Sequence, residues 1–137
     1  MNGDRAFFDT NVLIYLYSDH ETEKQNKAFN EFNKSERFVS TQVLTEFCNI
    51  CLKKLHLPVT EIDSALQEIS EACNVIIVDD SDLRHALSIQ DKYKYSYYDS
   101  LVIASALEAG CNLLFTEDMQ DGQLIEGVLT IKDIFKD

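Results

Sequence analysis

The chain has 137 residues, 45% of them hydrophobic and 26% charged, which is the size and composition of an ordinary globular protein. Its 24 Asp and Glu residues outnumber 12 Lys and Arg residues, and the net charge of −12 argues against a broad basic groove for nucleic acid. An anionic substrate would therefore need local help, such as a metal ion or a second subunit.

The sequence carries no signal for secretion or membrane insertion. No apolar run reaches the ~20 residues of a membrane span, and the N-terminal stretch "MNGDRAFF" has no hydrophobic signal-peptide core. One proline and four glycines leave no flexible linker, and no internal repeat is visible. We therefore expect a single domain over residues 1–137, located in the cytoplasm.

Short apolar runs alternate with amphipathic segments along the chain. Strands are expected at 5–8, 37–40, 74–78, 112–116 and 128–131, because most of these runs are apolar without alternation, as buried parallel strands are. Helices are expected at 11–17, 21–33, 41–56, 60–73, 81–93 and 97–109. The alternation predicts an α/β/α sandwich, with a central, mostly parallel sheet flanked by helices.

Individual residues mark two helix ends. Thr60 is expected to cap helix 60–73 with Asp63 at its third position, and Gly110 is expected to follow helix 97–109 as a left-handed residue. The pair Cys48 and Cys51 matches C-x-x-C, but it lies within a predicted helix and no second close pair exists. We therefore expect four free thiols in a reducing compartment rather than a redox or zinc site.

Two predicted strands run directly into acidic residues. In "FFDTNVLIY", Asp9 lies between two apolar runs, where burial would penalise its charge. Thr116 and Asp118 follow the strand near the C-terminus in the same way. Ligands of parallel sheets bind outside the carboxyl ends of strands. Helix capping by Asp9 or Asn11 and a turn at Asp118 would explain one such residue, but they explain the pair less well.

Two further carboxylates occur on predicted helices. Glu46 lies between Val43 and Ile50 on helix 41–56, at the border of its apolar stripe, so the alternative role is a snorkelling side chain or a buried ion pair. Asp99 is at the head of the most apolar helix, where Ser96 and Asp99 also fit a capping box. Both roles are compatible for Asp99, since an acid at a helix N-terminus still faces outward.

A cluster of four carboxylates needs a cation. At ~4 Å and an effective dielectric constant of ~20, each like-charged pair costs about 4 kcal/mol. Carboxylate ligands without His or Cys favour a hard ion, Mg²⁺ or Mn²⁺. Such an ion lowers the pKa of a bound water and offsets phosphoryl charge, so the pattern indicates phosphodiester hydrolysis.

The motifs resemble those of the PIN-domain ribonucleases, and most of all the VapC-type toxins of toxin–antitoxin pairs. The likeness runs from residue 7 to about residue 131, and it lies in the order of four motifs: Asp9-Thr-Asn11, Glu46 in "STQVLTEFCN", Asp99 in "YYDSLVIASA" and Thr116-x-Asp118.

The resemblance implies a PIN-like fold and an Mg²⁺ or Mn²⁺ site that acts on RNA. Its catalytic and metal-binding acids would be Asp9, Glu46, Asp99 and Asp118, supported by Asn11 and Thr116. It also implies a homodimer and a cognate antitoxin with a basic tail. In "TEDMQDG", the family pattern selects Asp118, which leaves Asp121 as a supporting group and the role of Glu117 open.

Two other functions compete with this interpretation. Haloacid-dehalogenase-like phosphatases begin with an apolar strand and D-x-D, but Asn11 stands where their general acid would be and the chain has no room for a cap domain. The second alternative is a PIN-like binding scaffold without turnover, since fold does not fix function. The full set of four acids counts against a scaffold.

Overall fold

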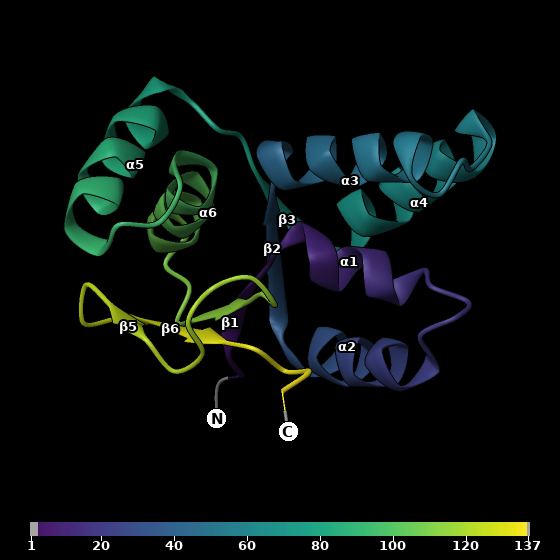
Figure 1. Cartoon of the computed structure of the whole chain (residues 1–137), viewed down its shortest axis with the longest axis horizontal. Coiled ribbons are helices and arrows are strands. Elements are labelled where there is room, and N and C mark those ends of the chain that lie inside the picture. The colour runs from purple at the N-terminus through teal and green to yellow at the C-terminus, as the bar shows by residue number, and fades with distance from the viewer. Residues whose placement is uncertain (1–2, 137) are drawn as a thin grey trace.

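A six-stranded sheet forms the centre of the computed structural model, which describes residues 3–136. The strand order is β3-β2-β1-β4-β6-β5, and every neighbouring pair is parallel except β5 with β6 (Figure 1). The bounds are β1 Arg5–Phe8, β2 Glu36–Ser40, β3 Asn74–Ile76, β4 Leu113–Phe115, β5 Leu124–Ile125 and β6 Leu129–Lys132.

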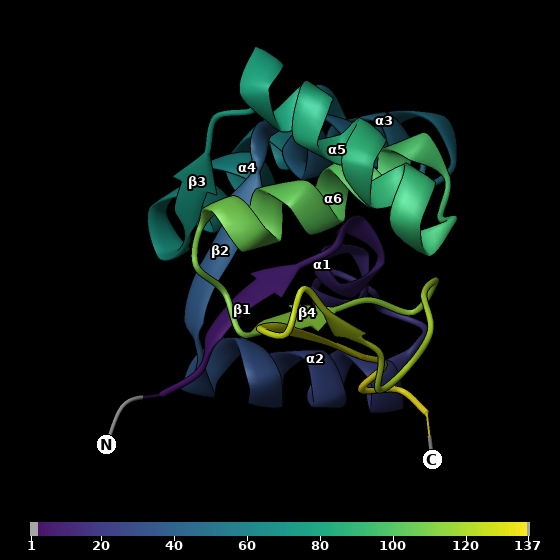
Figure 2. The same cartoon turned by 90° about the vertical axis from the view of Figure 1, so that its left-hand side faces the viewer.

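Helices cover both faces of this sheet. Figure 2 shows α6, with α5 beyond it, on one face and α2 on the other. The bounds are α1 Thr10–Leu16, α2 Thr22–Lys34, α3 Thr41–Lys53, α4 Val59–Ala72, α5 Asp80–Tyr93 and α6 Tyr97–Glu108. The expected α/β sandwich with a mostly parallel sheet is therefore confirmed. In residues 3–136, no helix is long and apolar enough to cross a membrane.

The central strand β1 is buried from both faces. Phe7 and Phe8 are fully buried, and the Phe8 ring lies 5.3 Å from the rings of both Phe32 on α2 and Phe115 on β4. Because the consecutive residues Ala6, Phe7 and Phe8 point to alternate faces and are all fully buried, β1 is apolar without alternation. The chain leaves this strand at Asp9, so that residue begins from a rigid point of the core.

Several local expectations are corrected by the structure. Helix α4 begins at Val59 with Pro58 as its N-cap, and no side chain makes the cap hydrogen bond, so the expected cap at Thr60 is wrong. The two-residue strand β5 was not expected, because so short a run carries no periodic signal. Gly110 has φ +73°, as expected for a residue that follows a helix, and all four cysteines are free.

Candidate active site

Asp9 caps α1 and also faces the end of the neighbouring strand. Its Oδ1 accepts a hydrogen bond of 2.8 Å from the backbone N–H of Thr10, and its Oδ2 accepts one of 2.8 Å from the hydroxyl of Thr116. Burial raises the pKa of Asp9 to about 6; the two hydrogen bonds lower it, and the charges of Asp99 and Glu46 raise it further. Capping of α1 therefore uses Oδ1 of Asp9, while Oδ2 is bound by the Thr116 hydroxyl at the end of β4.

The loop after β4 is bound to the start of α1. The Nδ2 of Asn11 donates a 2.8 Å hydrogen bond to Oδ2 of Asp118, and the backbone N–H of Glu117 donates to Oδ1 of Asn11 at 3.2 Å. The Thr116 hydroxyl oxygen also accepts from the backbone N–H of Asp118 at 3.2 Å. The ends of β1 and β4 thus place Asp9, Asn11, Thr116 and Asp118 in one hydrogen-bonded unit.

Glu46 reaches the same region from α3. The side chain of Ser40, at the end of β2, caps α3 by accepting from the backbone N–H of Val43 at 3.2 Å. The Nε2 of Gln42 donates to Oε1 of Glu46 at 2.8 Å and to the carbonyl of Tyr98 at 3.2 Å. Gln42 therefore joins α3 to the N-terminus of α6, a role that the sequence did not indicate.

Asp99 lies in the first turn of α6. The backbone N–H of Asp99 donates to the Ser96 hydroxyl at 3.1 Å, which forms the N-cap of α6 and one half of the expected capping box. The pKa of Asp99 is raised overall. Partial burial is the largest cause, and the charges of Asp118 and Glu46 add to it, whereas the Ser96 contact lowers the pKa.

Electrostatic interactions link all four predicted acids. Asp9 interacts with Asp99 and Glu46, and Asp99 interacts with Asp118 and Glu46. We call Asp9, Glu46, Asp99 and Asp118 the acid cluster. Across residues 3–136, no three His, Cys, Asp or Glu side chains converge closely enough to hold one ion as they stand. The amides of Asn11 and Gln42 bind two of these carboxylates instead, so the side chains would have to turn toward a cation.

The donor chemistry of the acid cluster fits a hard divalent cation. Every donor is a carboxylate oxygen, and Mg²⁺ and Mn²⁺ prefer such ligands. The raised pKa values of Asp9 and Asp99 reflect burial and mutual repulsion that a bound cation would relieve.

Two acids near Asp118 point elsewhere. Asp121 accepts a 2.9 Å hydrogen bond from the backbone N–H of Asp133, so its carboxylate holds the segment after β6. Glu117 binds Lys24 of α2 at 2.7 Å and the hydroxyl of Tyr15 on α1 at 2.7 Å. Partial burial raises the pKa of Glu117, but these hydrogen bonds outweigh it and keep the pKa below its usual range. Glu117 and Asp118 are therefore neighbours in sequence with different partners, because Asp118 binds Asn11.

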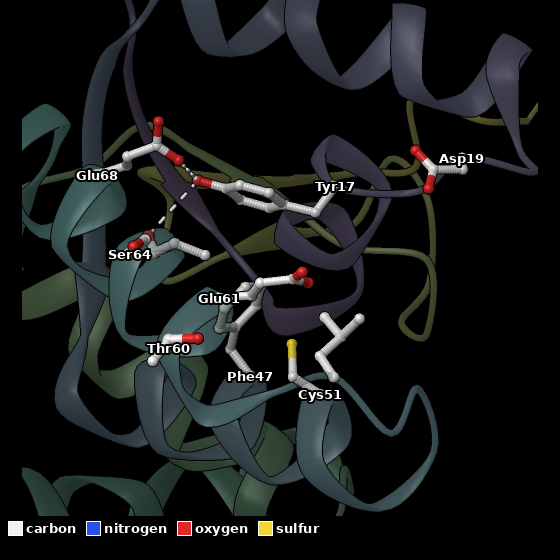
Figure 3. A pocket seen from close by; sticks show the side chains of 10 residues that line it. Tyr17, Asp19, Phe47, Cys51, Thr60, Glu61, Ser64 and Glu68 are labelled. Carbon is white, nitrogen blue, oxygen red and sulfur yellow. Dashed lines mark hydrogen bonds between the residues drawn. The ribbon is translucent and has the colours of Figure 1, made fainter.

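A separate hollow lies between the end of α1 and the pair α3 and α4. It has a volume of about 410 Å³, with apolar residues such as Phe47, Leu57 and Ala65 and with acids at its margin. Figure 3 shows Tyr17 reaching across this hollow to Glu68, to which its hydroxyl donates at 3.0 Å. None of the four acid-cluster residues lines it.

Comparison with known proteins gives a fold and a family. No curated protein sequence matches the chain. A toxin–antitoxin complex from Klebsiella pneumoniae is 21% identical, with a TM-score of 0.69 over 91% of this chain and 96% of that chain. VapC20 from Mycobacterium tuberculosis, described as a sarcin-ricin loop cleaving toxin, is 20% identical, with a TM-score of 0.65 over 82% of this chain and 91% of that chain.

A third similar structure is that of DNA-bound VapBC from Salmonella typhimurium. It is 18% identical, with a TM-score of 0.65 over 98% of this chain and 99% of that chain. At these identities the likeness concerns the fold. The sequence model of the PIN domain matches residues 6–120, a span that contains all four acids of the cluster. The chain belongs to the PIN-domain family, a family of nucleases.

Proposed function

We propose that the protein is a metal-dependent endoribonuclease that hydrolyses RNA phosphodiester bonds, and that it is the toxin of a toxin–antitoxin pair. The observation that carries this proposal is the acid cluster at the carboxyl edge of the sheet, where hydrogen bonds through Thr116, Thr10 and Gln42 link Asp9 to Asp118, to Glu46 and to the first turn of α6 that carries Asp99. Membership of a nuclease family supports the same chemistry.

Asp9, Glu46, Asp99 and Asp118 would hold the Mg²⁺ or Mn²⁺ ion. When bound, such an ion activates a water molecule and offsets phosphoryl charge. The chain itself orients the ligands: the Thr116 hydroxyl and the Thr10 amide fix both oxygens of Asp9, which is only 5% exposed. Gln42 and Asn11 restrain Glu46 and Asp118 with amide donors that add no charge. Neutral donors of this kind leave the cluster negative and attractive to a cation.

The acidic composition bears on how RNA and other partners are bound. With a net charge of −12, the chain repels a polyanion at long range, and the proposed cation would provide only local compensation. We propose a homodimer on the likeness to toxin–antitoxin proteins; because a second copy carries the same negative charge, each subunit would still depend on its own cation to compensate the charge of RNA. Light scattering at micromolar concentration tests this part: a monomeric mass would contradict it.

The hollow of Figure 3 supports an antitoxin partner. Its floor includes Phe47 and Leu57, and its margin carries the carboxylates of Asp19, Glu61 and Glu68. An apolar side chain flanked by Lys or Arg complements both features. We propose that a basic and apolar antitoxin segment binds here. Co-purification with the product of the adjacent reading frame should give a complex whose association slows as salt rises; separate species would contradict the proposal.

Cleavage assays test the enzymatic proposal. The purified protein is incubated with a labelled single-stranded RNA and a labelled RNA hairpin, with Mn²⁺, with Mg²⁺ or with a chelator. We expect cleavage with the metals, none with chelator, and none for Asp9→Asn. If wild type shows no metal-dependent cleavage but still binds the antitoxin, the chain is a binding scaffold. A phosphatase assay on a small phosphomonoester should remain negative.

A further inference from the structure

The side chain of Glu117 is held by two residues that are distant in sequence. Tyr15 donates to Oε1 of Glu117 at 2.7 Å, and Lys24 donates to Oε2 at 2.7 Å. Lys24 also donates to the Tyr15 hydroxyl at 3.0 Å, which closes a triangle of three polar groups. Both carboxylate oxygens of Glu117 are therefore occupied. We call Tyr15, Lys24 and Glu117 the Glu117 clamp.

Aromatic rings support this clamp. The ammonium of Lys24 lies 4.6 Å from the centroid of the Tyr15 ring and 5.6 Å from that of Phe135. The Tyr15 and Phe135 rings pack edge to face at 4.8 Å. The side chains of Lys24 and Glu117 are only 34% and 28% exposed, so their ion pair is partly shielded from water. Because it is partly shielded from water and packed against aromatic rings, the ion pair of the clamp has less freedom to move than an exposed ion pair would have.

The clamp acts on the loop that carries Asp118. Glu117 lies between Thr116, which donates to Asp9, and Asp118, which accepts from Asn11. The clamp draws the Glu117 side chain toward α1 and α2, and Asn11 holds Asp118 on the side of the acid cluster. Fixing one side chain of the pair limits the backbone rotations open to the other.

We propose that the Glu117 clamp holds the loop of Asp118 beside the acid cluster and so positions Asp118 for cation binding. This inference rests on the proposed function, because it assigns Asp118 to the cation. Tyr15, Lys24 and Glu117 are positioning residues that act through Asp118. Groups that orient the ligands of a metal typically change its affinity by 10-fold to 100-fold when they are removed.

A second group of the same three residue types supplies matched controls. Lys92 and Tyr93 of α5 bind Glu126 in the turn between β5 and β6, at 2.8 Å and 2.6 Å. We call these three residues the Glu126 clamp. It fixes a hairpin to α5 and includes no residue adjacent in sequence to an acid of the cluster. Identical substitutions can therefore be made in both clamps.

The test measures the Mn²⁺ concentration that gives half-maximal RNA cleavage. Tyr15→Phe and Lys24→Met should each raise it about 10-fold, while the maximal rate at saturating Mn²⁺ stays within about twofold of wild type. Tyr93→Phe and Lys92→Met should leave both quantities within about twofold of wild type. Phe and Met retain most of the apolar contact, so the variants are expected to fold.

Lys24→Met separates positioning from simple electrostatics. Loss of a positive charge near the acids would by itself strengthen cation binding, whereas loss of positioning weakens it. Tyr15→Phe alters no charge at all. The proposal would be overturned by tighter Mn²⁺ binding in Lys24→Met, or by a half-maximal Mn²⁺ concentration in Tyr15→Phe that equals that of wild type.

A metal-free measurement distinguishes failure of the clamp from failure of the proposed function. The backbone amide of Asp118 donates to Thr116, so its hydrogen exchange reports the order of the loop. Exchange should be about 10-fold faster in Tyr15→Phe and Lys24→Met than in wild type or the controls. Equal exchange in all variants would overturn the clamp, whether or not Mn²⁺ binds. Absence of metal-dependent cleavage in wild type would instead overturn the proposed function.

Discussion

The Glu117 and Glu126 clamps have the same chemistry and different surroundings. Each consists of a Lys ammonium and a Tyr hydroxyl bound to one Glu carboxylate, but the Lys and Glu side chains are 34% and 28% exposed in the first and 63% and 38% exposed in the second. The first holds the loop beside the acid cluster, and the second holds a hairpin. We therefore expect the two ion pairs to contribute differently to the protein, because they hold different segments and water reaches them to different extents.

The largest difference in RNA cleavage should appear between substitution of an acid of the cluster and substitution of the Glu of the Glu126 clamp. Asp99→Asn should reduce metal-dependent RNA cleavage at least about 100-fold, whereas Glu126→Gln should leave it within about twofold. Asn retains the Ser96 cap, because the donor there is the backbone N–H of residue 99. It also removes repulsion from Asp118 and Glu46. Cleavage of a labelled RNA by both variants provides the measurement.

Melting temperatures provide the control for this prediction. Without metal, Asp99→Asn should melt at the same temperature as wild type or higher. Added Mn²⁺ should raise the melting temperature of wild type more than that of the variant, since an ion that binds only the folded state stabilises it. A variant that still cleaves RNA, or that melts lower without metal and responds to Mn²⁺ like wild type, would make Asp99 a structural residue.

The pH dependence of stability should differ in sign between the two regions. Because the pKa of Asp9 rises from 3.8 to about 6 on folding, the folded protein binds this proton more tightly than the unfolded chain. Stability should therefore fall as pH rises from about 4 to about 6 and stay level above that. The shift corresponds to about 3 kcal/mol. Lys92 lowers the pKa of Glu126, so that contact is lost instead as pH falls below about 4.

Urea unfolding in the presence of a chelator tests this contrast. Wild type should lose stability between pH 4 and pH 6, and Asp9→Asn should lose much less, because Asn has no proton to release. Glu126→Gln should retain the wild-type slope over the same interval. A slope that Asp9→Asn leaves unchanged would assign the pH dependence to other groups, with Asp99 the first candidate because its pKa is also raised.

Much of the fold could be predicted from the sequence because most helices are long enough to show a periodic apolar stripe and the central strands are apolar throughout. The apolar stripe that includes Leu44, Phe47 and Cys51 marks α3, and the unbroken apolar run of β1 indicates burial on both faces. The strand β5 could not be predicted, since Leu124 and Ile125 form too short a run to show a period. The start of α4 is fixed by backbone geometry at Pro58 rather than by a capping side chain.

The candidate site could be predicted only in part for a different reason. A strand that ends in an acid is visible in the sequence, which is why Asp9 and Asp118 could be named. Several contacts at the site join different elements: Gln42 of α3 reaches the carbonyl of Tyr98 on α6, and Tyr15 and Lys24 meet Glu117 across about a hundred positions of sequence. No local pattern shows such contacts, so only the structure assigned Glu117 to a clamp.

The smallest expected effect is the coupling within each clamp. A double-mutant cycle combines Lys24→Met with Glu117→Gln, and a second combines Lys92→Met with Glu126→Gln. The first pair should show a coupling of about 1 kcal/mol in the free energy of unfolding, because partial burial and two aromatic rings shield it from water. The second pair should be additive within error, since exposed charges are screened by water and salt. Equal coupling in both cycles would mean that shielding does not distinguish the clamps. Any effect of the Glu117 clamp on the Mn²⁺ concentration needed for cleavage would then have to arise from the position of its loop alone.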